Sequence, residues 1–105
     1  MATTHKIYWW NLENLFDIEN SPRRSPFLQK VLGRELRGWT QSILDTKINN
    51  LTSVITKFNE GIGPDVLGVC EVENLHVLDL LSSSLNTSLN RNYQVLLNTK
   101  KIKFY

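Results

Sequence analysis

The segment Asp65–Val72 (DVLGVCEV) is a short, nearly continuous apolar run, and it constrains the fold more than any other part of the sequence. A run of this kind is typical of a strand that is covered on both faces inside a parallel sheet. A parallel strand needs a neighbour that runs in the same direction, and the two are usually joined by a helix. The run therefore predicts an α/β fold, provided that the chain also supplies a second strand and a crossover helix.

Both of these elements precede the apolar run. Residues His5–Asn11 (HKIYWWN) are rich in aromatic and β-branched side chains, which favours a strand. Residues Thr40–Asn59 carry one apolar stripe at spacings of three and four, which indicates an amphipathic helix that Thr40 can cap. The stripe consists of Ile43, Leu44, Ile48, Leu51, Val54, Ile55 and Phe58.

The remaining segments complete a β-α-β-α-β order. Residues 17–38 lack a periodic pattern, so we expect a long excursion there, with a short helix around Phe27–Leu32. After the apolar run, Asn74 is placed to cap a second helix with an apolar stripe of four leucines, and Tyr93–Leu97 is expected to form a third strand. The excursion carries basic residues that we interpret as parts of a solvated loop rather than as phosphate contacts: Arg23, Arg24, Arg34 and Arg37.

Two polar residues, Asn11 and Glu71, stand at the ends of the first two predicted strands. In a right-handed parallel unit the C-terminal ends of both strands lie at one edge, where ligands of open α/β sheets gather. A carboxylate in an apolar run is costly unless its charge is compensated, and Mg²⁺ compensates it with one or two carboxylates plus water and phosphate oxygens. Alternatively, Glu71 is solvated beyond the strand and Asn11 closes a turn. The spacing leaves both interpretations open.

The composition limits the classes of protein to which this chain can belong. The 105 residues make at most one domain, and 41% hydrophobic residues indicate a globular chain. A net charge of +2 is too small to indicate a nucleic-acid or membrane partner. Cys70 is the only cysteine, which excludes a disulfide framework, and we expect it to be a small core residue. We read neither a signal peptide nor a membrane-spanning run, and therefore expect a cytoplasmic chain.

Two motifs resemble the N-terminal part of the endonuclease/exonuclease/phosphatase superfamily, whose members include DNase I-like nucleases and inositol-phosphate phosphatases. They are YWWNLENLFD (Tyr8–Asp17) and, in the same order, GPDVLGVCEVEN (Gly63–Asn74). Within this superfamily, the motifs most resemble those of a group of bacterial proteins that open with an Asn-Val-Glu-Asn-Leu-Phe-Asp motif. The resemblance implies a four-layer α/β/β/α sandwich, of which residues 1–105 would form a truncated N-terminal part. It also favours the active-site interpretation of the polar edge.

The resemblance implies Mg²⁺- or Mn²⁺-assisted hydrolysis of a phosphoester. It places Asn11 near the metal and the scissile phosphate, and it makes Glu71 the metal-binding glutamate. Glu13 lies where some relatives carry a second acidic residue. Asn14 and Asp17 match the group's signature, and we expect turn and hydrogen-bond roles for them. The substrate can be DNA, RNA or a small phosphoester.

The resemblance also implies later catalytic motifs, among them a histidine paired with an aspartate that activates water. The only histidines are His5 and His76, neither in a Ser-Asp-His context, so we expect neither to be catalytic. We therefore expect weak cation binding, no activity of the chain alone, and self-association through a sheet face with Trp9 or Trp10 left uncovered. The alternative function is that of a non-catalytic α/β remnant that binds a partner.

Overall fold

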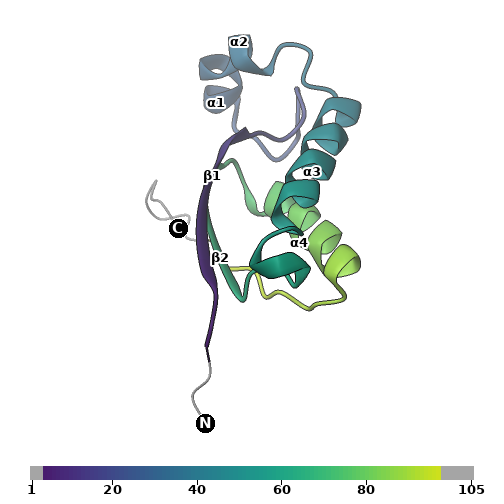
Figure 1. The fold of residues 1–105 in the computed structure, drawn as a ribbon. Helices are drawn as coiled ribbons and strands as arrows, with labels where there is room; N and C mark the ends of the chain where they lie inside the picture. The colour runs from purple at the N-terminus through teal and green to yellow at the C-terminus, as the bar shows by residue number, and fades with distance from the viewer. Residues whose placement is uncertain (1–3, 98–105) are drawn as a thin grey trace.

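A computed structural model describes residues 4–97 and confirms a strand–helix–strand unit. Figure 1 shows the two strands side by side, with the two long helices on the same side of the sheet. Neither of these 15-residue helices, nor any shorter helix in the described part, is long and apolar enough to cross a bilayer. The elements in chain order are β1 (Ile7–Leu15), α1 (Pro26–Val31), α2 (Gly33–Leu36), α3 (Gln41–Ile55), the 3-10 turn η1 (Asn59–Gly61), β2 (Val66–Val72) and α4 (Leu75–Leu89).

β1 and β2 pair in parallel, with a regular register from Ile7 opposite Val66 to Asn11 opposite Cys70. The next partners are Leu15 and Val72, so residues 12–14 of β1 lie opposite a single residue of β2. β1 therefore continues four residues beyond its predicted end, through a bulge that the sequence pattern did not predict. A bulge of this kind bends the strand and re-aims its side chains.

Helix α3 begins where Thr40 was predicted to cap it, since the Thr40 hydroxyl oxygen accepts a hydrogen bond from the Ile43 amide at 3.3 Å. The predicted stripe is correct at its centre and wrong at its margins, where Ile43 is 44% and Val54 42% exposed. Both line a shallow hollow together with Trp10 of β1 and Trp39. The stripe residues that do reach the core are Leu44, Ile48, Leu51 and Ile55.

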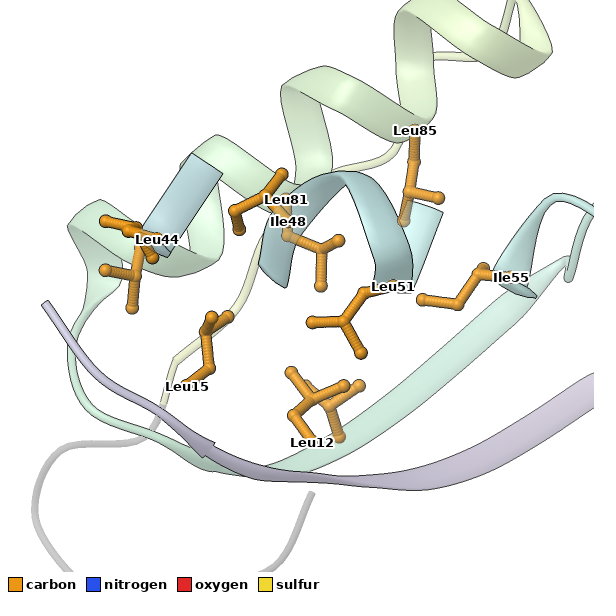
Figure 2. Packing of buried hydrophobic residues seen from close by; sticks show 10 residues of the cluster. Leu12, Leu15, Leu44, Ile48, Leu51, Ile55, Leu81 and Leu85 are labelled. Atoms are coloured by element: carbon orange, nitrogen blue, oxygen red, sulfur yellow. The ribbon is translucent and has the colours of Figure 1, made fainter. Parts of the chain in front are cut away.

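The core lies between the sheet and the two long helices (Figure 2). Leu12 and Leu15 of β1 point toward the α3 side chains, and Leu81 and Leu85 enter from α4. Each fully buried leucine of this kind contributes about 2 kcal/mol through removal of apolar surface from water. The predicted stripe of α4 holds except at Leu75, which is 47% exposed. Cys70 is buried, as expected.

The predicted third strand at Tyr93–Leu97 is wrong, because these residues pair with no other strand. The Tyr93 amide donates instead to Asn86 Oδ1 at 2.7 Å, and its hydroxyl donates to the Pro64 carbonyl oxygen at 2.6 Å. Burial does alternate along the segment, since Tyr93, Val95 and Leu97 are half-buried and Leu96 is 89% exposed, but alternation without backbone partners does not make a strand. Within residues 4–97 the fold is α/β with one two-stranded sheet, and the four-layer sandwich stays a prediction.

Candidate functional site

Asn11 and Glu71 lie beside each other across the two parallel strands, as predicted. The Asn11 side-chain amide Nδ2 donates a hydrogen bond to Glu71 Oε2. Both residues are exposed. The Glu71 carboxylate is solvated, as one of the two open interpretations expected, although the neighbouring Val69 and Cys70 are buried. The contact joins residues 60 positions apart at one edge of the sheet.

The bulge in β1 shapes this edge. Glu13 and Asn14 have φ angles of 53° and 63°, and Glu71 opposite them has 58°. All three lie in the left-handed region, which costs a non-glycine residue about 1–2 kcal/mol. The turn is held on one side by Asn11 Oδ1, which accepts from the Glu13 amide at 2.7 Å. On the other side Lys47 Nζ of α3 donates to the Glu13 carbonyl oxygen at 2.7 Å.

Behind this edge lies a buried ion pair that the sequence pattern did not predict. The Arg24 guanidinium donates to both Glu73 oxygens, from Nε to Oε2 at 2.7 Å and from Nη2 to Oε1 at 2.6 Å. The prediction of a solvated loop is therefore wrong for Arg24, which is 7% exposed. An arginine in an aperiodic segment gives no local sign of burial. The only available signal was Glu73, a second carboxylate directly after a buried strand.

Asp17 belongs to the same buried network and is fully buried. Burial raises the pKa of its carboxyl group, but hydrogen bonds from Arg23, Ser21, Asn74 and the Ile18 amide outweigh burial and hold that pKa well below its usual range. The carboxylate oxygens accept from Ser21 Oγ and Arg23 Nε at 2.8 Å and from Asn74 Nδ2 at 3.1 Å. The predicted hydrogen-bond role of Asp17 is confirmed, and these donors occupy the carboxylate.

The residues of the edge fit one kind of metal ion better than others. Within residues 4–97 no group of three or more His, Cys, Asp or Glu side chains is placed to hold an ion. The described residues therefore do not offer a site for Zn²⁺, which takes three or four protein ligands. Mg²⁺ is commonly held by one or two carboxylates, with water and phosphate oxygens completing its shell. The solvated Glu71 carboxylate beside the Asn11 amide fits this ion.

The two histidines lie elsewhere. His5 precedes β1 and is exposed, whereas His76 stands in the first turn of α4 and is half-buried. Asn74 is confirmed as the cap of α4, because its side-chain oxygen accepts from the Val77 amide at 3.0 Å. The structure therefore brings together Asn11, Glu71 and the backbone of Glu13, and leaves both histidines outside this group.

Comparison with known proteins agrees with the motif resemblance. The sequence of residues 6–100 matches the model of the endonuclease/exonuclease/phosphatase family. The searches against curated proteins and against solved structures gave no significant match. The family consists of hydrolases that act on phosphoester or nucleic-acid substrates. With nearly its whole length matched, this chain belongs to the endonuclease/exonuclease/phosphatase family.

Proposed function

We propose that the edge formed by Asn11 and Glu71 is the cation-holding part of a phosphoester-hydrolase site that uses Mg²⁺ or Mn²⁺. Glu71 supplies the carboxylate ligand. Asn11 fixes the orientation of that carboxylate and presents an amide that can also orient a water or a phosphate oxygen. Glu13, on the bulge, supplies a further acidic side chain. The observation that carries the proposal is the side-chain contact between Asn11 and Glu71 across the two strands.

The local backbone supports an active site over an ordinary polar turn. Strained φ/ψ values persist only where the surroundings enforce them, and they cluster at functional sites. Asparagine tolerates the left-handed region well, so Asn14 alone would need no special explanation. Glutamate is less suited to it, yet Glu13 and Glu71 both adopt it on facing strands. A carboxylate has about four lone-pair sites, and the Asn11 hydrogen bond occupies one of those on Glu71.

A bound cation supplies charge neutralisation at the phosphoryl oxygens and at the leaving oxygen. Removal of a proton from the attacking water needs a general base, which is typically worth ~10²–10⁴ in rate. Among the described residues, the side-chain hydrogen bonds of Asn11 and Glu71 join them to each other and to the Glu13 amide, and not to a histidine. We therefore expect this 105-residue chain to bind a divalent cation at millimolar concentration and to hydrolyse a generic phosphodiester at most at a trace rate.

The test is titration of the ¹⁵N-labelled chain with Mn²⁺, followed by paramagnetic broadening of its amide signals. We expect broadening to centre on residues 11–14 and 71–72 and to be lost in Glu71→Gln. Glu60→Gln is the matched control, because Glu60 is also exposed and has a positive φ of 57° but lies in η1. Broadening that centres elsewhere, or that survives Glu71→Gln unchanged, contradicts the proposal.

A second candidate function, that of a partner-binding α/β unit without catalysis, is favoured by the exposed apolar face of the sheet. Ile7 is 72% exposed, and Trp9 and Val66 are each 53% exposed. The same Mn²⁺ titration separates the candidates, because a binding unit of this kind needs no cation at Glu71.

A further inference from the structure

We propose that Arg24 and Glu73 are positioning residues for the Asn11–Glu71 pair. Their ion pair ties the chain leaving β1 to the chain leaving β2, and so keeps Glu71 within reach of Asn11. This inference rests on the function proposed for that pair. It assigns a role to two residues that touch neither the proposed cation nor its substrate.

A single guanidinium contacts both chain exits. Arg24 Nη2 donates to Glu73 Oε1 at 2.6 Å and to the Asp17 carbonyl oxygen at 2.8 Å. Glu73 Oε1 also accepts from the Asp17 amide at 2.9 Å, which closes the link from the β2 exit to the β1 exit. Arg24 Nη1 adds a hydrogen bond to the Ile18 carbonyl oxygen at 2.9 Å. Arg24 thus joins the backbone after β1 to the Glu73 side chain after β2, and its Nη1 also donates to Gln29 Oε1 of α1 at 2.9 Å.

The burial of the pair points to positioning rather than to stability as its main role. The Arg24 side chain is 0% and the Glu73 side chain 8% exposed. A buried ion pair is often no more stabilising than an apolar pair of similar volume, because removing two charges from water is costly. A bidentate arginine–carboxylate pair does, however, fix direction and distance. The strained edge requires such a fixed geometry, because the Glu71 carboxylate must keep its direction relative to Asn11.

Glu73 follows Glu71 with only Val72 between them. The Glu73 amide donates to the Leu15 carbonyl oxygen at 3.0 Å, and its side chain is held by Arg24. Glu71 is therefore confined between the regular register that ends at Cys70 and an anchor two residues later. This confinement explains how a glutamate keeps a φ of 58°. Release of the anchor lets residue 71 relax toward extended backbone and carries its carboxylate away from Asn11.

The experiment compares Glu73→Gln, which keeps the shape of the side chain and removes its charge, with Leu85→Val. Leu85 is a fair control for a loss of stability because it packs near Ile55, at the other end of the core from Leu15 (Figure 2). Three quantities are measured on the folded 105-residue chain: the NMR signals of the Asn11 side-chain amide, the HN–Hα coupling of Glu71 and the midpoint of Mn²⁺ broadening. Glu71→Ala, which leaves no side-chain acceptor at position 71, provides the signals of a broken contact.

We expect Glu73→Gln to shift the Asn11 amide signals toward those of Glu71→Ala, to change the Glu71 coupling and to raise the Mn²⁺ midpoint at least three-fold. Leu85→Val should change none of these.

Unaltered Asn11 signals and an unaltered Glu71 coupling in Glu73→Gln overturn the inference. If that variant does not fold, Arg24→Lys is measured in its place with the same expectations, and loss of the fold in both variants marks the pair as purely structural. Absence of Mn²⁺ broadening in the unmodified chain refutes the proposed function instead, while the Asn11 signals still decide the positioning role.

Discussion

Two carboxylates close to the same edge of the sheet have opposite surroundings. Asp17 is fully buried and accepts hydrogen bonds from an arginine, a serine and an asparagine side chain, whereas Glu71 is exposed and accepts one from Asn11. An anion that is already saturated with donors stabilises the fold but has no lone pair to offer a cation. Of the two carboxylates, only Glu71 is free to serve as the proposed cation ligand, whereas Asp17 stabilises the fold.

The first prediction concerns acid stability. Because the folded-state pKa of Asp17 lies below its unfolded value, the ionised Asp17 stabilises the protein fully above that unfolded value. The contribution is lost as the pH falls through the folded pKa. We therefore expect the free energy of unfolding to decline as the pH is lowered from about 5 to 2. Asp17→Asn should be less stable by ~3 kcal/mol at pH 7 and should show a flatter decline, as measured by urea denaturation at a series of pH values.

The control for this prediction is Asp79→Asn, since Asp79 is an exposed carboxylate on α4. Its free energy of unfolding should stay within about 0.5 kcal/mol of that of the unmodified chain at pH 7. A decline between pH 5 and 2 that is equally steep with and without Asp17 would show that other groups govern acid unfolding.

Some features of the helices and strands can be predicted from neighbouring residues in the sequence, whereas others depend on contacts with distant residues. The caps Thr40 and Asn74 were predictable, because a cap acts on amides two or three residues away. The side-by-side placement of Asn11 and Glu71 was also predictable, because it follows from the order of the elements alone. The bulge at residues 12–14 was not, because the left-handed turn depends on Lys47 from α3 and on Glu71 from β2.

Two other failures have the same origin. Arg24 was misassigned because its burial depends on Glu73, which lies 49 positions away. The segment Tyr93–Leu97 has the composition of a strand, but a strand exists only where a neighbour offers backbone partners, and β2 pairs only with β1 in the described part of the chain. Local patterns thus predicted the helices and the strand order, while the network behind the site needed the three-dimensional structure.

The second prediction compares the two helix caps. Thr40→Ala should lower the free energy of unfolding by ~1 kcal/mol, the typical loss for a cap. Asn74→Ala should cost more, ~2 kcal/mol, because Asn74 both caps α4 and donates to the buried Asp17 carboxylate at 3.1 Å, and a buried acceptor that loses its donor adds its own penalty. Urea denaturation followed by helix ellipticity measures both losses. Ser83→Ala, at an exposed position inside α4, serves as the control and should change the free energy of unfolding little. Equal losses for the two cap variants would contradict the double role of Asn74.

The two long helices α3 and α4 both lie on one face of the sheet (Figure 1). Tyr8 and Trp10 point toward the helices and pack against Phe58, at ring centroid distances of 4.6 and 6.0 Å. Successive side chains of a strand alternate between its faces, so Ile7 and Trp9 lie on the opposite face. Soluble monomers rarely expose a contiguous apolar patch, and unpaired strand edges favour association. A second sheet or another copy of the chain can cover this face.

The third prediction is that the 105-residue chain associates through this face. Its mass by light scattering should rise with concentration above that of a monomer, because association removes Ile7, Trp9 and Val66 from water. Trp9→Thr keeps a good strand residue and removes the largest apolar side chain, and should shift the mass toward the monomer. Phe27→Ser is the matched control, because Phe27 is 73% exposed but lies on α1. If Phe27→Ser disperses the chain and Trp9→Thr does not, the contact surface lies on the excursion around α1, and the sheet face is not the site of association.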